Sequence, residues 1–255
     1  MSTPDDRTIQ TRWIQVSPRF TLDTKDLKVT EYRDVESEPI KPTWSERVRA
    51  LLGRSSDNLR DRSPRLRRQK IHTYDFNNTE LPLKIFMDRM AGWFFEPAED
   101  LLQKQQDVAA VHLVTPMIEA LEQRYKGVYT PGHSRQFFNE RADIMFSLRS
   151  NTVLDLLYGG LRCGFAHHGF LKDDTEQYNI LITRGLSKPV EYNDGILWID
   201  APQYVAEIRK AFEKYYARVG YDADLLQKFM KSWNDDWQMS LRVPGAGGTT
   251  SATVP

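Results

Sequence analysis

Apolar residues that recur every three or four positions, from Leu81 onward, constrain the fold of this chain more than any other feature. This spacing is typical of amphipathic helices that bury one face. It predicts helices over residues 81–102, 107–125, 134–148, 151–170, 202–219 and 223–241. Pro97 and Pro116 should kink the first two, because proline lacks the amide donor. With 40% apolar and 11% aromatic residues, the chain can build a sizeable core, so we expect a mainly helical protein.

One stretch between the helices departs from this period. Residues 178–183 read YNILIT and residues 195–199 read GILWI, which are short runs of strand-forming residues. The turn-forming sequence Asn193-Asp194-Gly195 comes directly before the second run. We therefore expect a β-hairpin inserted between the fourth helix and the C-terminal helices.

Residues 1–78 show no sustained period, and five prolines interrupt them. Although the whole chain balances 35 basic against 35 acidic side chains, residues 45–70 hold nine basic and three acidic residues, a net charge of +6. We expect an irregular polar arm over 1–78 with this basic segment, a helical domain over 79–240 and a disordered tail over 241–255. Two interpretations of the segment stay open: a solvated linker, or an RNA-binding stretch that uses Arg65, Arg67 and Arg68.

Several classes of protein are excluded by composition. The single cysteine, Cys163, rules out an internal disulfide framework and a zinc site built on several thiolates. No apolar run approaches the roughly 18 residues of a membrane helix, and residues 1–10 are polar and acidic rather than a signal sequence. Nucleotide-binding glycine motifs and the nucleophile elbow are missing from the sequence. We expect a cytoplasmic protein without a cofactor, a metal or a membrane partner.

The helix expected over residues 151–170 carries the residues with the clearest chemistry. On a wheel of about 100° per residue, its core stripe consists of Leu154, Leu157, Leu161 and Phe165. The opposite side holds three small residues, Gly159, Cys163 and Ala166, with Arg162 at one edge and His167 at the other. Small residues let a second helix approach closely, so we expect a homodimer through this helix.

Arginine grips phosphate with a rigid fork, and histidine exchanges a proton near neutral pH. The pair Arg162 and His167 therefore suits phosphodiester transfer. The spacing alone is a weak signal, because Arg67 and His72 in the N-terminal region also have four residues between them. Arg162 and His167 differ from Arg67 and His72 in lying on an expected helix with an apolar core stripe, and this difference favours them as the functional pair.

Arg162, four intervening residues and His167 match the Arg-x4-6-His signature of HEPN domains. The entry Leu-Tyr-Gly-Gly-Leu-Arg-Cys-Gly into this signature and Glu119 in the second helix also resemble HEPN proteins, over about residues 78–219. The resemblance implies a HEPN-like helical bundle that dimerises and cleaves RNA without a metal. Arg162 would hold the scissile phosphate, His167 would assist the 2′-hydroxyl or the leaving 5′-oxygen, and Glu119 would orient Arg162.

The resemblance further implies a 2′,3′-cyclic phosphate product, a toxin or antiphage setting, and an inhibitory or activating protein partner. HEPN proteins usually carry Asn or Asp after the arginine, where this chain has Cys163. This departure favours the alternative function, a noncatalytic HEPN-like module that binds RNA, a nucleotide or a protein partner.

Structural roles for the same residues also stay open. Arg162 would then pair with Glu119 or Asp155, and His167 would cap the end of its helix. Cys163 and His167 lie four residues apart on one helical face and would supply half of a metal site. His112 lies between apolar residues of the second helix, where a core or interface histidine is the expected role.

Overall fold

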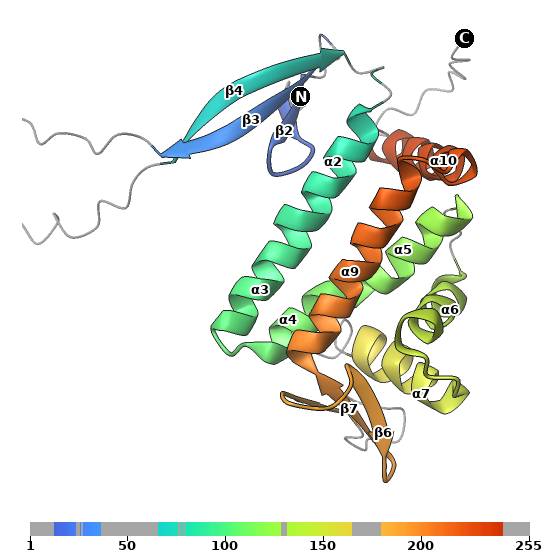
Figure 1. Ribbon diagram of the computed structural model, residues 1–255. Helices are drawn as coiled ribbons and strands as arrows, with labels where there is room; N and C mark the ends of the chain where they lie inside the picture. Colours follow the sequence, from blue (N-terminus) through green and yellow to red (C-terminus); the bar gives the residue numbers. More distant parts are fainter. Residues whose placement is uncertain are drawn as a thin grey trace, which may run out of the picture. The chain divides into compact units, whose positions relative to one another are not determined.

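The computed structural model describes residues 13–23, 26, 28–36, 66–75, 78, 80–128, 132–164 and 180–241. The chain divides into two compact units, residues 1–89 and residues 90–255. Most of the described residues are helical, and two small sheets accompany the helices (Figure 1). The expectation of a mainly helical protein is therefore confirmed. None of the helices in these ranges combines the length and the apolarity that a membrane crossing requires.

The first unit holds a four-stranded antiparallel sheet in the order β1-β2-β3-β4. Its strands are β1 (Trp13–Gln15), β2 (Phe20–Asp23), β3 (Lys28–Glu36) and β4 (Leu66–Asp75). Helix α2 (Leu81–Met90) follows the sheet along the chain. A β-bulge interrupts the register of β3 and β4, because Glu31 lies opposite His72 whereas Tyr32 lies opposite Lys70.

The expectation of an irregular arm over residues 1–78 is wrong for residues 13–15, 20–23, 28–36 and 66–75, which form the strands of this sheet. The buried members of β2 and β3, among them Phe20, Leu22 and Val29, make too short an alternation to stand out between prolines. Strand β4 reads LRRQKIHTYD and lies at the edge of the sheet, where polar side chains are usual. Residues 45–65 of the basic segment and residues 242–255 of the expected tail lie outside the described residues.

Helices make up most of the second unit. In chain order they are η2 (Ala91–Phe95), α3 (Glu96–Gln103), α4 (Asp107–Val114), α5 (Pro116–Lys126), α6 (Ser134–Phe146), α7 (Asn151–Asp155), η3 (Leu156–Gly164), α9 (Ala201–Val219) and α10 (Ala223–Leu241). Pro97 and Pro116 lie in the first turns of α3 and α5, where the missing amide donor costs no hydrogen bond. The backbone keeps helical φ and ψ at Glu96 and Thr115, so the expected kinks stay a prediction. Gly127 ends α5 in the left-handed conformation, with φ of 65°.

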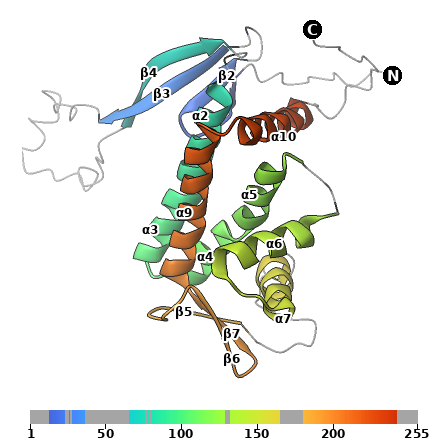
Figure 2. The same ribbon diagram turned by 45° about the vertical axis from the view of Figure 1, so that its right-hand side comes forward.

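The core of the second unit lies where α4, α5 and α9 meet. Their fully buried side chains include Val111, Ile118, Tyr204, Ile208 and Phe212. Tyr204 also places its hydroxyl 3.3 Å from the hydroxyl of Thr115, between α4 and α5. The two views in Figures 1 and 2 show α6 beside α5, and α7 on the far side of α6.

A three-stranded sheet precedes α9, in the order β5 (Ile180–Thr183), β7 (Ile196–Asp200), β6 (Val190–Asn193). The hairpin turn at Asp194-Gly195 is present, with φ of 52° and 79°. Its first strand is β6, however, whereas β5 pairs with β7 in parallel (Figure 2). The predicted pairing of residues 178–183 in the hairpin is therefore wrong, because the polar strand β6 carries no strong strand signal.

Candidate functional site

Arg162 and Glu119 lie 43 residues apart in the sequence and meet in the second unit. Arg162 Nη2 donates a hydrogen bond to Glu119 Oε2 at 3.2 Å. The other oxygen of Glu119 accepts a weaker hydrogen bond from Gln123 Nε2 at 3.4 Å. The contact that the sequence predicted between Arg162 and Glu119 is therefore present.

The position of Glu119 follows from the local structure of α5. Pro116 begins the helix, and the apolar residues Met117, Ile118 and Leu121 turn into the core. Glu119 lies in the first turn, where the positive end of the helix dipole favours a carboxylate. The residue is only 7% exposed, so its charge depends on the guanidinium beside it.

Arg162 comes from η3, which has the wider geometry of a π-helix rather than an α-helix. Such segments are rare and often occur at functional sites. Leu154, Leu157 and Leu161 are buried, as the helical wheel predicted. Gly159 is exposed and has no described atom within 4 Å of the position a Cβ would take, whereas Cys163 on the same predicted side is half-buried and Ala166 lies outside the described residues.

The guanidinium of Arg162 has hydrogen-bonding capacity to spare. Its side chain is 27% exposed and carries five N–H donors, of which the contact with Glu119 uses one. Its Nε is buried and has no hydrogen-bond partner among the described residues. A planar, anchored and partly exposed guanidinium of this kind can bind a phosphate or a carboxylate.

Tyr158 flanks the same guanidinium and was not singled out by the sequence. The centre of its ring is 6.0 Å from Arg162 Cζ, and its ring packs edge-on against Phe138 at 5.5 Å. Burial raises the pKa of the Tyr158 hydroxyl, and the nearby Cys163 thiol raises it further. Tyr158 therefore stays protonated at neutral pH and can donate a hydrogen bond. Its position four residues before Arg162 in one helix was the available signal.

Three other residues that the sequence singled out near Arg162 are Asp155, Cys163 and the predicted catalytic His167. Asp155, the other candidate partner of Arg162, instead pairs with Arg135, with 2.7 Å between Arg135 Nη2 and Asp155 Oδ1. Cys163 is a half-buried free thiol. His167 lies outside the described residues, and so does any pairing that involves it.

The predicted RNA-binding arginines belong to the first unit. Arg65 lies outside the described residues, and the backbone of Arg67 belongs to β4. Arg68 is exposed, donates from Nη2 to the carbonyl oxygen of Pro18 at 2.8 Å, and places Nε 3.8 Å from Asp34.

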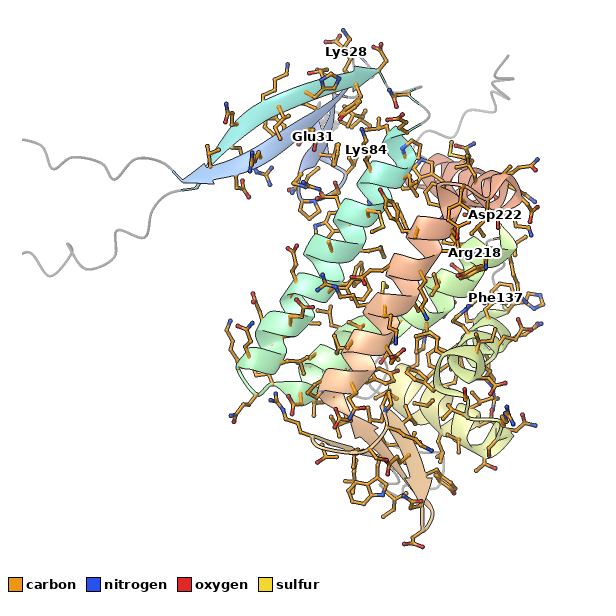
Figure 3. All side chains as sticks on the ribbon, viewed as in Figure 1. Lys28, Glu31, Lys84, Phe137, Arg218 and Asp222 are labelled. Carbon is orange, nitrogen blue, oxygen red and sulfur yellow. The ribbon has the colours of Figure 1, made fainter. Side chains whose placement is uncertain are left out.

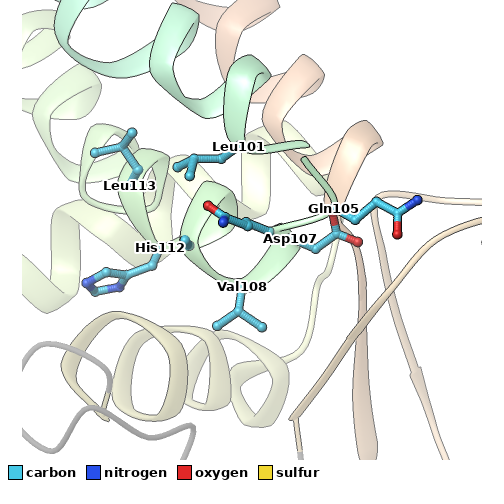
Figure 4. Close-up of a pocket in the computed structure, with 8 residues that line it drawn as sticks. Leu101, Gln105, Asp107, Val108, His112 and Leu113 are labelled. Atoms are coloured by element: carbon cyan, nitrogen blue, oxygen red, sulfur yellow. The ribbon is translucent and has the colours of Figure 1, made fainter. Parts of the chain in front are cut away.

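The second unit also contains an open hollow of about 510 Å³ at the start of α4 (Figure 4). Its mainly apolar lining includes Leu101, Val108 and Leu113. Burial lowers the pKa of His112 at its edge, which keeps this imidazole neutral at pH 7. Asp107, the charged lining residue, is engaged by Arg184 Nε at 2.7 Å. The hollow therefore suits an apolar group better than a phosphate, and it shares no lining residue with the Arg162 site.

No group of three or more His, Cys, Asp or Glu residues in the described ranges is arranged to hold a metal ion. The cluster around Arg162 instead combines one cation, one buried carboxylate, one phenol and one thiol. Comparisons of the chain with protein-family models, with curated proteins and with solved structures find no match.

Proposed function

We propose that this protein is a metal-independent endoribonuclease of the HEPN type. The observation that carries the proposal is the anchored guanidinium of Arg162, bonded to the buried Glu119 and open to solvent over about a quarter of its surface. The Arg-x4-His spacing in the sequence supplies a histidine for proton transfer, His167.

In the proposed reaction, the 2′-hydroxyl oxygen of the RNA attacks the adjacent phosphorus and the bond to the 5′-oxygen breaks. The attacking hydroxyl loses its proton and the departing oxygen gains one, so the products are a 2′,3′-cyclic phosphate and a 5′-hydroxyl. Arg162 neutralises the charge that builds up on the phosphate oxygens. Glu119 fixes the guanidinium plane, and His167 moves one of the two protons.

A homodimer through residues 151–170 belongs to this proposal. The exposed Gly159 leaves room for a partner backbone beside Arg162, which would bring two arginines to one RNA strand. A toxin or antiphage role, with an inhibitory or activating protein partner, is the physiological setting that the HEPN resemblance suggests.

Incubation of total RNA with the full chain in excess EDTA, followed by a denaturing gel, tests the proposal. We expect discrete fragments from the wild type and none from His167→Ala or Arg162→Ala. Arg162→Lys keeps the charge but loses the fork, so it should retain at most a small part of the activity.

Arg218→Ala is the matched control, because Arg218 is an exposed arginine of the same unit that pairs with Asp222 at 2.9 Å (Figure 3). This variant should cleave like the wild type. Intact RNA in every lane, with and without cell extract as a source of an activator, would contradict the nuclease and favour a noncatalytic binding module. The Cys163 that follows Arg162 is the observation in favour of that second function.

A further inference from the structure

The π-helix η3 brings three of its side chains together, those of Tyr158, Arg162 and Cys163. Backbone hydrogen bonds in a π-helix run from residue i to residue i+5, so the fourth and the fifth residue after Tyr158 both come round to its side. The Tyr158 ring centre lies 6.0 Å from Arg162 Cζ. Burial raises the pKa of the Tyr158 hydroxyl, and the Cys163 thiol beside it raises this pKa further. A protonated phenol therefore lies next to the anchored guanidinium.

The ring of Tyr158 is held in place by helix α6. It packs edge-on against Phe138, with 5.5 Å between the ring centres, and Phe138 is fully buried. Tyr158 itself is half-buried, so packing fixes the ring without enclosing the residue. The neighbour of its hydroxyl, the sulfur of Cys163, is a weak hydrogen-bond acceptor, whereas a phosphate oxygen is a strong one. The hydroxyl is therefore a positioned donor that can exchange its neighbour for a ligand.

The charges around Arg162 make a neutral donor valuable. The buried carboxylate of Glu119 lies 3.2 Å from Arg162 Nη2, so the two charges cancel and the pair has no net charge to attract an anion. Binding of a phosphate then depends on how many donors converge on its oxygens. The partly exposed guanidinium supplies its unused N–H groups, and the Tyr158 hydroxyl adds an O–H without adding a charge.

We propose that Tyr158 is the second donor of the Arg162 site and that its hydroxyl binds a non-bridging oxygen of the scissile phosphodiester. The hydroxyl keeps its proton throughout, so it adds no proton transfer to the proposed reaction. Its hydrogen bond strengthens as negative charge builds up on the phosphate oxygens, which lowers the barrier. The inference deepens the proposed function and rests on it, since it names a further residue that contacts the reacting phosphate.

Tyr158→Phe removes the hydroxyl and keeps the ring that packs on Phe138. In single-turnover cleavage of RNA by the full chain in excess EDTA, we expect the rate constant to fall by about 100-fold, the usual loss for one transition-state donor. The midpoint of chemical denaturation should stay that of the wild type.

Tyr125→Phe is the matched control and should cleave like the wild type. Tyr125 also flanks an arginine that pairs with a buried glutamate, since its ring centre lies 4.1 Å from Cζ of Arg141, the partner of Glu122. An unchanged rate in Tyr158→Phe, or an equal loss in Tyr125→Phe, would overturn the proposal.

Sulfur in place of one non-bridging oxygen at the cleaved linkage separates a direct contact from a structural role. Sulfur accepts hydrogen bonds more weakly than oxygen. One of the two phosphorothioate diastereomers should therefore slow the wild type more than it slows Tyr158→Phe, which has already lost this hydrogen bond. Equal effects of sulfur on the two proteins, for both diastereomers, would reject the contact.

A uridine dinucleotide with a 2′-O-methyl group separates this inference from the nuclease, because it has one phosphodiester and no attacking hydroxyl. In calorimetric titration we expect Tyr158→Phe to bind it about tenfold more weakly than the wild type and Tyr125→Phe do. If the wild type cleaves no RNA, this loss keeps the phosphate site and rejects only the nuclease, whereas equal binding by the three proteins, or none by the wild type, rejects both. Cleavage of RNA at the same rate by the wild type and Tyr158→Phe rejects only the role of Tyr158.

Discussion

Helix α5 carries two buried glutamates less than one helical turn apart, and each faces an arginine from another helix. Glu122 binds Arg141 of α6 through two guanidinium nitrogens, at 2.5 and 2.7 Å, and also lies 3.8 Å from Lys126 Nζ. The guanidinium of Arg141 also stacks 4.1 Å from the centre of the Tyr125 ring. Glu119 binds Arg162 through one contact at 3.2 Å.

The two pairs differ in the exposure and the unused N–H donors of their arginines, which distinguishes a structural arginine from one that can bind a ligand. The Arg141 side chain is 11% exposed and its charge is used within the fold, whereas the Arg162 side chain is 27% exposed and keeps unused donors. The two pairs share the same helix and the same residue types. The number of donors left over, rather than the presence of an ion pair, therefore marks the candidate site.

The largest expected effect is on stability at the closed pair. Arg141→Ala leaves the carboxylate of Glu122 buried, with Lys126 as the one other cation near it among the described residues, so we expect the free energy of unfolding to fall by about 3–5 kcal/mol. Chemical denaturation followed by circular dichroism measures this. If the free energy of unfolding fell by less than about 1 kcal/mol, Arg141 would not be a structural arginine, and the two pairs would not differ in role.

The same measurement on Arg162→Ala should give a smaller change. One contact at 3.2 Å is lost instead of two shorter ones, and the buried Glu119 keeps the hydrogen bond from Gln123, so we expect a loss of about 1–3 kcal/mol, while RNA cleavage falls by at least about 100-fold under the proposed function. A loss of stability as large as that of Arg141→Ala would make Arg162 a structural residue.

Gly159→Ala tests whether the open side of η3 stays open. A Cβ at this position meets no atom within 4 Å, and alanine favours a helix over glycine, so we expect a gain of up to about 1 kcal/mol in the stability of a monomer. If a second copy packs there, Gly159→Trp should lower the mass measured by sedimentation. An unchanged mass together with unchanged activity would reject a homodimer that packs through this helix.

The smallest effect is expected far from both pairs, at Asp107. The hydrogen bond from Arg184 holds the pKa of this carboxyl below its ordinary value of 3.8. Because the folded pKa is the lower one, the stabilisation is complete above about pH 4 and is lost as the pH falls through the folded pKa. Arg184→Ala should therefore reduce the free energy of unfolding at pH 7, and the reduction should shrink as the pH falls through the folded pKa of Asp107. A reduction that does not change with pH would mean that Arg184 acts through its other contact, with the carbonyl oxygen of Leu102.

The sequence predicted the longer helices of the second unit, such as α5, α9 and α10, because their apolar residues recur at helical spacing. A single α-helix was expected over residues 151–170, whereas the structure has the short α7 followed by the π-helical η3.

The sequence also predicted that Glu119 and Arg162 would meet, although spacing alone left Asp155 as an equal partner. Asp155 is not the partner of Arg162 because its side of α7 faces Arg135, and this orientation is visible only in the folded structure. The contribution of Tyr158 was missed, although its position four residues before Arg162 in the same helix was a signal, and its packing on Phe138 appears only in the folded chain.

The first unit was predicted poorly for a physical reason. A small sheet with one covered face needs few apolar residues, and its edge strand β4 has none of the alternation that identifies a strand. The parallel pairing of β5 with β7 was missed because it joins segments that lie 17 residues apart along the chain, and local patterns carry no information on it.

The position of Arg162 within η3 depends on the number of residues that precede it in this helix. Each residue added to or removed from a helix turns every later side chain around the axis, by about 100° in an α-helix and by a smaller angle in a π-helix, whose turns hold more residues. Deleting a single residue from the Leu156-Leu157-Tyr158 stretch would leave the composition of this helix almost the same and swing Arg162 away from Glu119. The site is therefore set by the count of residues between α7 and Arg162 as much as by their identity.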